Sequence, residues 1–252
     1  MIDVIILGFG NVGSHLCTAL GESHNISINQ IYNRSKFKLS PEFDHIPITT
    51  KLSEIKNADV FIIAVSDDVI DTFSSSLPLK NKLVVHTSGS VALTRISDRN
   101  RRGVLYPLQT FSKDRSVDFK DIPICIEAEN PEDLKTLKKI GQELSNKVVE
   151  INSEERGRLH LAAVFVNNFV NYLYSIGQDM LAIDELPFDL LRPLIIETAK
   201  KTETLAPNDA QTGPAFRNDK KTIEKHLHLL ADSPHKRLYE YLTEVIQEKY
   251  NN

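Results

Sequence analysis

The sequence predicts an α/β protein in which a doubly wound, mostly parallel sheet is followed by an all-helical domain. Three observations predict it: short β-rich apolar runs alternate with helical patterns up to residue 151, a glycine-rich turn follows the first run, and only helical patterns occur afterwards. Strands that alternate with helices form right-handed crossovers, which give a parallel sheet with helices on both faces. We therefore expect two domains, residues 1–151 and residues 152–252.

The first domain is expected to contain eight strands. The first, Ile2–Leu7, is apolar at nearly every position, as a strand buried on both faces should be. A helix is expected over residues 12–21, and another over residues 131–145. Asn130 can cap the start of the second helix, and Pro131 stands at its first position, where proline is favoured. The other strands are predicted at residues 28–32, 46–49, 60–65, 83–85, 104–106, 122–126 and 148–151.

The second domain is expected to be helical throughout. Residues 159–178 contain no Asp, Glu, Lys or Arg, and a helix without charge on any face is buried on most sides. Three asparagines and one histidine in this stretch argue against a membrane span, because each would face hydrocarbon unpaired. We expect a central helix between domains or subunits, whose polar stripe faces partners or a ligand. Further helices are predicted to start near Pro187 and Ser233.

Composition narrows the classes of function. Thirty basic residues against 34 acidic ones give a net charge of −4, which disfavours nucleic acid as a partner. The first residues lack the basic segment and cleavage site of a signal peptide, so the expected location is the cytoplasm. Cys17 and Cys125 lie far apart and outside any C-x-x-C pair, so we expect neither a disulfide framework nor a zinc site, and no other metal site.

The stretch Gly8-Phe9-Gly10-Asn11-Val12-Gly13 has the pattern G-x-G-x-x-G. It directly follows an apolar strand and opens a helix, which is the context that dinucleotide binding requires. Gly8 would permit the tight turn, Gly10 the approach of a pyrophosphate, and Gly13 close packing of helix on strand. The helix N-terminus then offers N–H groups to the phosphates. A Rossmann-type cofactor site is predicted, and a glycine turn without a ligand is the alternative.

The end of the second strand favours NADP over NAD. NAD sites usually have Asp or Glu there to accept hydrogen bonds from the ribose 2′-hydroxyl, whereas this chain has Asn33, Arg34 and Ser35. A carboxylate would repel a 2′-phosphate, while Arg34 can bind it with two hydrogen bonds and Ser35 can donate another. The alternative is a solvated basic loop.

Two further strand ends point to the same crevice, because ligands of open α/β sheets bind beyond the carboxyl ends of strands. The fourth strand ends in Val65-Ser66-Asp67, and Asp67 is either a cofactor contact or a helix cap. His86 ends the fifth strand, where it either bonds ribose or substrate or is a core histidine. The small residues that follow it would let a nicotinamide ring lie against the backbone; they are Thr87, Ser88 and Gly89.

With these motifs the chain resembles the superfamily of pyrroline-5-carboxylate reductase and β-hydroxyacid dehydrogenases. Within it, the chain is most similar to Rossmann-like NADP oxidoreductases with a DUF2520 carboxyl-terminal domain. The resemblance rests on the glycine motif, the Asn33-Arg34-Ser35 trio and the stretches 86–89, 106–111, 160–168 and 212–219. It implies a homodimer built largely from the helical half and leaves the substrate open. Many relatives have histidine at the position of Tyr106.

Hydride transfer to C=O or C=N needs a nearby proton donor or oxyanion stabiliser. The β-hydroxyacid dehydrogenases have a lysine on the long interdomain helix, and this chain has none there. His160 is the titratable group in that region, and Asn167 and Asn168 follow seven and eight residues later, a spacing that shares one face of an α-helix. These side chains either form a catalytic pocket, with His160 and Asn168 in catalytic roles, or bond to one another in a buried interface.

Substrate contacts are expected from the loop that enters the next helix. Arg217 is the cation in this loop that can hold a carboxylate with two hydrogen bonds, and we expect Thr212 and Gly213 to face the cleft with it. Gln109 and Thr110 would line the cleft from the sheet side.

Two functions follow from the sequence. The first is an NADP-dependent oxidoreductase that acts on a small carbonyl or imine compound. The second is a non-catalytic NADP-binding sensor or scaffold, which the missing lysine favours.

Overall fold

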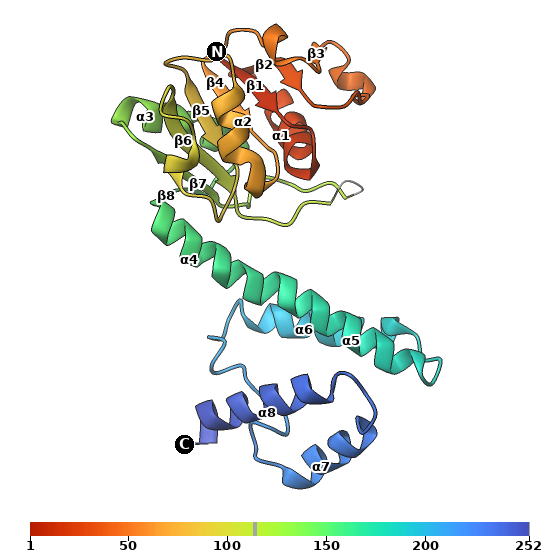
Figure 1. Cartoon of the computed structure of the whole chain (residues 1–252). Coiled ribbons are helices and arrows are strands. Elements are labelled where there is room, and N and C mark those ends of the chain that lie inside the picture. Colours follow the sequence, from red (N-terminus) through yellow and green to blue (C-terminus); the bar gives the residue numbers. More distant parts are fainter. Residues whose placement is uncertain (113–114, 252) are drawn as a thin grey trace. The chain divides into compact units, whose positions relative to one another are not determined.

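The structure, a computed structural model, describes residues 1–112 and 115–251. It divides into two compact units, Met1–Val166 and Asn167–Asn252, and each is described by itself (Figure 1). The strand-rich part ends before residue 153, where a long helix begins, but the first turns of this helix pack on the sheet and belong to the first unit. The domain boundary expected after residue 151 stays a prediction.

The first unit is built on an eight-stranded sheet with the order β3-β2-β1-β4-β5-β6-β7-β8. Neighbouring strands are parallel except for β6 and β7, which pair antiparallel. The predicted fold class, a mostly parallel Rossmann-type sheet with helices after it, is confirmed. The strands are β1 (Ile2–Leu7), β2 (Ile26–Tyr32), β3 (Ile48–Thr49), β4 (Val60–Ile63), β5 (Leu83–His86), β6 (Arg101–Pro107), β7 (Ile124–Ala128) and β8 (Val148–Glu150).

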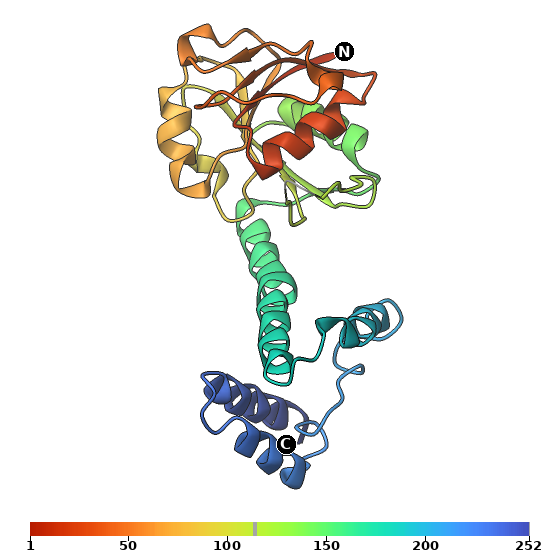
Figure 2. The same ribbon diagram turned by 90° about the vertical axis from the view of Figure 1, so that its right-hand side faces the viewer.

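Helices cover both faces of the sheet. Along β1, Val4 and Ile6 join a core with α1 (Asn11–Gly21) and α3 (Pro131–Leu144), while Ile5 and Leu7 join a second core with α2 (Ile70–Ser76). Figure 2 shows α1 in red and α2 in orange on opposite sides of the strands. Because alternate side chains of a strand point to opposite faces, β1 is apolar at almost every position. This confirms the interpretation of its sequence.

Several predicted boundaries differ from the structure. The strands expected at 104–106 and 122–126 are β6 and β7, which extend to Arg101 and to Ala128. The two strands pair antiparallel, and Gly103 lies opposite Ala128. The paired segment includes the polar residue Glu127, which a pattern of apolar residues did not indicate as part of a strand. The strand expected at 46–49 shrinks to β3. Short 3-10 turns connect other elements, at Pro41–Phe43, Leu52–Glu54, Asp67–Val69, Leu93–Arg95 and Phe188–Leu190.

The long helix expected after residue 152 is interrupted. It consists of α4 (Ser153–Ala163), a π-helix η5 (Val164–Phe169) and α5 (Val170–Ala182). The single chain leaves several of its apolar side chains exposed, among them Val166, so the burial expected from its composition is not found within one chain. Within residues 1–112 and 115–251, no helix combines the length and hydrophobicity needed to cross a bilayer.

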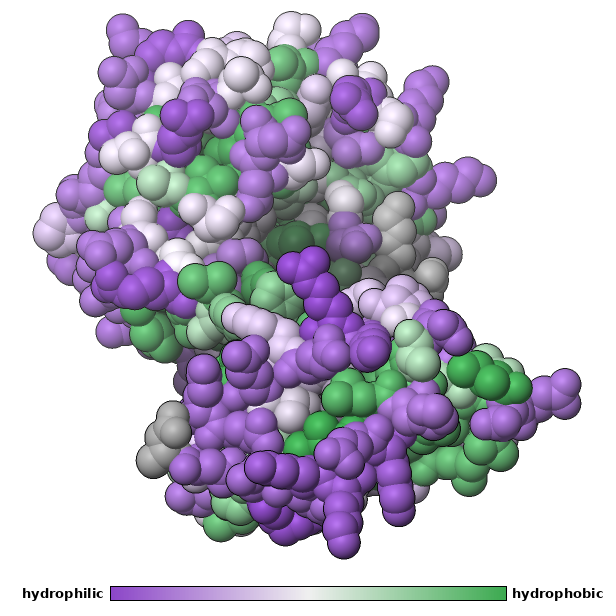
Figure 3. Space-filling model, turned by 60° about the horizontal axis from the view of Figure 1, so that its bottom comes forward, coloured by the Kyte–Doolittle hydropathy of each residue, from purple (hydrophilic) through white to green (hydrophobic). Residues whose placement is uncertain are grey.

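The second unit consists of α5 and three further helices, α6 (Arg192–Lys201), α7 (Lys220–Leu229) and α8 (Lys236–Asn251). Asp219 caps α7, because its Oδ1 accepts a hydrogen bond from the Thr222 N–H at 3.1 Å. Figure 3 shows hydrophobic side chains, in green, at the surface of this unit between hydrophilic ones. Exposed apolar patches on proteins commonly mark interaction surfaces.

Candidate cofactor and active site

The strand order reverses between β1 and β4, because the chain leaves β1 first toward β2 and β3 and later toward β4 and β5. Ligands of doubly wound sheets bind at this point, beyond the carboxyl ends of the strands. The glycine motif ends β1 there, and it touches the end of β4: a Cβ on Gly8 would lie 2.4 Å from the Ala64 carbonyl oxygen. The predicted cofactor residues after β1 and β4 therefore meet at one crevice.

The three glycines of the motif differ in their surroundings. Gly8 has a φ of +108°, in the left-handed region that favours glycine. A Cβ on Gly13 would lie 2.1 Å from the Gly8 carbonyl oxygen, so helix α1 can pack on β1 only with glycine at this position. A Cβ on Gly10 would meet nothing within 4 Å. The exposed side of Gly10, at the start of α1, is thus open, and its contact with a diphosphate stays a prediction.

Asn33 ties the glycine turn to the loop after β2. Its Oδ1 accepts a hydrogen bond from the Phe9 N–H at 3.1 Å, and its Nδ2 donates to the Ser35 carbonyl oxygen at 2.8 Å. Both ends of the Asn33 amide are therefore used to shape the site. Arg34 is exposed next to it, and its guanidinium makes no hydrogen bond or ion pair with the residues that the structure describes.

The loop after β5 is built by its own hydroxyl groups. Thr87 Oγ1 donates to the Ile63 carbonyl oxygen at 3.3 Å, and Ser88 Oγ accepts from the N–H groups of Ser90 and Val91 at 3.1 Å each. Asp67, at the end of β4, accepts a hydrogen bond from Ser90 Oγ at 2.6 Å. Thr87 and Ser88 are buried, while Ser66 and Asp67 are exposed, and cofactor contacts of all four stay predictions.

His160 reaches this sheet edge from α4. Its Nδ1 lies 3.1 Å from the hydroxyl of Tyr106, a residue near the end of β6, and the two rings meet edge to face. Both rings lie against Gly89: a Cβ there would be 2.6 Å from His160 Nδ1 and 2.7 Å from Tyr106 Cζ. His160 and Tyr106 thus fill the side of Gly89 on which a Cβ would stand, and a contact of Gly89 with a nicotinamide stays a prediction.

The Tyr106 hydroxyl stays protonated near neutral pH. Burial raises the pKa of Tyr106 to about 12, and the charges of Cys125 and Asp67 add to the rise. The phenol donates to Nδ1 in the tautomer that has its proton on Nε2, and it accepts from Nδ1 when that atom carries the proton. Sequence reasoning selected His160 and named Tyr106 only in the resemblance, without a role in the site, because it lies 54 residues away in the chain.

His86 ends β5 and is fully buried. Its Nδ1 accepts a hydrogen bond from the Ser88 N–H at 3.2 Å. Burial, together with the nearby charge of Arg156, lowers the pKa of His86 to about 4, so the imidazole is neutral near neutral pH. Because the side chain has no exposed surface, we assign it no contact with a substrate in the proposals below.

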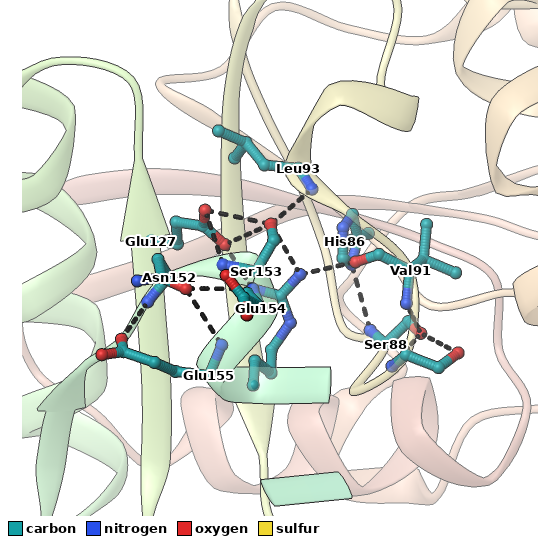
Figure 4. A network of polar contacts seen from close by, with 11 residues as sticks. His86, Ser88, Val91, Leu93, Glu127, Asn152, Ser153, Glu154 and Glu155 are labelled. Carbon is teal, nitrogen blue, oxygen red and sulfur yellow. Dashed lines mark hydrogen bonds and ion pairs between the residues drawn. The ribbon is translucent and has the colours of Figure 1, made fainter. Parts of the chain in front are cut away.

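Helix α4 is fixed to the sheet by a buried polar network (Figure 4). Arg156 forms an ion pair with Glu127 of β7, and its Nη2 donates to the Val91 carbonyl oxygen at 2.5 Å. Ser153 donates to Glu127 from both its N–H and its hydroxyl, and its Oγ accepts from the Leu93 N–H at 2.9 Å. The sequence analysis missed this network. The one signal of the network in the sequence was the position of Arg156. It lies four residues before His160, which places both side chains on the same face of the helix.

The segment after β6 lies beside the start of α1. Asn11 Nδ2 donates to the Phe111 carbonyl oxygen at 2.9 Å, and His15 Nε2 lies 3.0 Å from the Ser112 carbonyl oxygen. Gln109 and Thr110, just before, are exposed, and the Thr110 N–H donates to Gln109 Oε1 at 2.8 Å. These two residues are thus in the same unit as the glycine motif, and their contact with a substrate stays a prediction.

The remaining candidates belong to the helical unit. Thr212 and Arg217 are exposed, and Gly213 has a φ of +110°. Asn167 and Asn168 are exposed on η5. The spacing argument that joined them to His160 assumes α-helical periodicity, which a π-helix with its i→i+5 bonds does not keep. The roles of all these candidates stay predictions. For the two asparagines, helical spacing no longer supports a shared face with His160.

Comparisons with known proteins give the family. The model of the DUF2520 family, a domain of unknown function, matches residues 122–246, and that of the coenzyme F420-dependent NADP oxidoreductases matches residues 3–89. A candidate NADP oxidoreductase from Bacteroides fragilis has 39% identity over 98% of each chain, with a TM-score of 0.87. The chain belongs to this family of Rossmann-type NADP oxidoreductases with a DUF2520 domain. The resemblance predicted from the sequence is confirmed, and so is NADP as the cofactor of the family.

More distant structures share the fold. A protein from Thermotoga maritima has 22% identity over 99% of this chain and 100% of its own, with a TM-score of 0.82. The imine reductase of Myxococcus stipitatus, solved in complex with NADP+, has 14% identity over 98% and 93% of the two chains, with a TM-score of 0.65. No protein of curated function matches the chain.

Proposed function

We propose that this DUF2520 protein transfers hydride between NADP(H) and a small carbonyl or imine compound. The observation that carries the proposal is the contact of His160 with Tyr106 at the carboxyl ends of the strands, on the same sheet edge as the glycine motif. A reductase needs a group that exchanges a proton beside its cofactor, and His160 on α4 supports the proposal as the candidate for that group.

The glycine motif and the loop after β2 fit a dinucleotide phosphate. The start of α1 offers backbone N–H groups to a diphosphate on the open side of Gly10. Ser35 and the exposed Arg34 lie where the loop is held by Asn33, and a guanidinium matches the geometry of a 2′-phosphate. We assign Gly8, Gly10 and Gly13 to the turn, and Arg34 and Ser35 to the 2′-phosphate.

Replacing Arg34 with alanine is expected to weaken NADPH binding by about 10- to 100-fold, because charge-assisted hydrogen bonds to a phosphate contribute roughly 1.5–3 kcal/mol. NADH has no 2′-phosphate, so its affinity should stay within about twofold of the unmodified protein's. Fluorescence titration with both nucleotides checks this. Equal losses for NADPH and NADH would mean that Arg34 supports the loop and does not select the cofactor.

His160 supplies the proton, and Tyr106 holds its ring in place. NADPH, when bound, supplies the hydride that reduces the carbon of C=O or C=N, and negative charge then develops on the oxygen or nitrogen. His160 as imidazolium donates a hydrogen bond from Nδ1 to the Tyr106 oxygen, and it gives its Nε2 proton to the oxygen or nitrogen of the substrate. The imidazole is left neutral. Tyr106 keeps its own proton throughout, because its pKa is about 12.

The test of this function is NADPH consumption with a panel of cyclic imines, ketones and aldehydes. Saturable turnover with one of them is expected. If NADPH binds but no member of the panel is reduced, and no alcohol or amine of the panel is oxidised with NADP+, the non-catalytic sensor or scaffold becomes the better account.

We infer that a second copy of this chain covers the exposed apolar side chains of the helical part. Val166 is 74% exposed and Ile183 80% exposed in the single chain, and residues 159–178 offer no charge to solvent. Light scattering should give the mass of two chains, and Val166→Asp should give the mass of one with the first unit still folded. A single-chain mass for the unmodified protein would contradict the homodimer.

A further inference from the structure

We propose that Arg156 and Glu127 are positioning residues that hold His160 against Tyr106. Their ion pair joins α4 to β7 one helical turn before His160. Only the expected effect of these two residues on turnover rests on the proposed function. The placement of His160 itself is a property of the protein without cofactor.

The ion pair is poorly suited to be a device for stability alone. Arg156 is 1% exposed, and its Nε has no hydrogen-bond partner among the described residues. Removing a charged pair from water costs several kcal/mol per ion, and well-packed apolar residues of similar volume are often as stable. What the pair supplies, and apolar residues would not, is direction, because each hydrogen bond fixes one atom of the guanidinium.

The anchors of Arg156 come from separate parts of the first unit. Glu127 belongs to β7, Val91 to the loop after β5, and Ser153 to the first turn of α4, where its Oγ lies 3.3 Å from Arg156 Nη2. In Figure 4, Glu127, Ser153 and Val91 converge on one point between the sheet and the helix. The network therefore sets both the rotation of α4 about its axis and its position along that axis.

His160 depends on both settings. It lies four residues after Arg156, so the two side chains share a face of α4. The contact that it must make is narrow: Nδ1 is 3.1 Å from the Tyr106 hydroxyl, and the ring lies so close to Gly89 that a Cβ there would be 2.6 Å away. A displacement of α4 by about 1 Å would break the hydrogen bond or press the ring on the backbone, and misplacement of that size can cost about 100-fold in rate.

The test compares Arg156→Lys with Arg158→Lys. Lysine keeps the charge of Arg156 but loses the forked geometry. Arg158 is an exposed arginine of the same helix that pairs with Glu154, so it is a matched control. Nuclear magnetic resonance of 15N-labelled histidine, without cofactor, reports the tautomer of His160 and the hydrogen bond at Nδ1. The Tyr106→Phe variant gives the signals of a His160 ring that lacks this bond.

We expect the His160 signals of Arg156→Lys to move toward those of Tyr106→Phe, and those of Arg158→Lys to stay at their original positions. In turnover, Arg156→Lys should lower kcat by about 100-fold while the KM for NADPH stays within about twofold. Glu127→Gln, which keeps an acceptor for Ser153, should show the same signature if Arg156→Lys does not fold.

Unchanged His160 signals in a folded Arg156→Lys or Glu127→Gln protein would overturn the inference, and so would an equal shift in Arg158→Lys. If the unmodified protein reduces no substrate while the resonance shifts appear as expected, the proposed function fails and the positioning role stands. The two failures are therefore distinguishable.

Discussion

Replacing Gly10 with alanine is expected to leave the protein folded and to weaken NADPH binding by about 100-fold, or about 2.7 kcal/mol. A Cβ at this position meets nothing within 4 Å, and the φ of −82° is open to any residue, so the chain itself has no reason to resist the change. The new methyl group would stand where the diphosphate must approach the backbone. Thermal unfolding and a calorimetric NADPH titration measure the two effects separately.

Gly13→Ala is the matched control. Here the new Cβ would lie 2.1 Å from the Gly8 carbonyl oxygen, so the turn and α1 must separate and the melting temperature should fall together with the affinity. An unchanged NADPH affinity in Gly10→Ala would place the diphosphate elsewhere and remove the assigned role of the turn.

His160→Ala is expected to lower kcat by about 100- to 10,000-fold, the usual contribution of a positioned acid or base. The affinity for NADPH should stay within about twofold, because the glycine motif and Arg34 are supplied by other elements of the unit. Steady-state kinetics with the best substrate of the panel, together with a binding titration, checks both parts. The substitution removes a partly buried ring and so carries a modest cost in stability.

The Tyr106→Phe variant separates proton donation by His160 from the orientation of the His160 ring by the Tyr106 hydroxyl. It keeps His160 but removes the hydroxyl at 3.1 Å, so kcat should fall less than in His160→Ala. If His160→Ala retains full turnover, the proton comes from another group and the assignment of this pair is wrong. An equal loss in both variants would instead make Tyr106 an acid in its own right.

Local features of the sequence predicted most of the fold. The glycine turn and the cap of α3 by Asn130 depend on a few consecutive residues, and the structure confirms both. The reversal of β7 was not predictable, because its apolar pattern fits a parallel or an antiparallel neighbour equally well. The π-helix η5 left no signal in a pattern that was analysed with an α-helical period.

The site was predictable only in part, because local features indicated some of its residues and tertiary contacts determine the others. His160 was selected as the titratable group of its helix, but its partner Tyr106 is 54 residues earlier and ends a strand. The burial of Arg156 depends on Glu127 and on the Val91 carbonyl, from two other elements. Charged residues near a helix start usually face solvent, as Arg158 and Glu154 do, and only tertiary packing distinguishes Arg156 from them.

The most direct test of the account is a calorimetric titration of the unmodified protein with NADPH and with NADH. The account predicts one NADPH per chain and an affinity for NADPH about 10-fold or more above that for NADH, which reflects the guanidinium of Arg34. Absence of NADPH binding, or equal affinity for the two nucleotides, would contradict it.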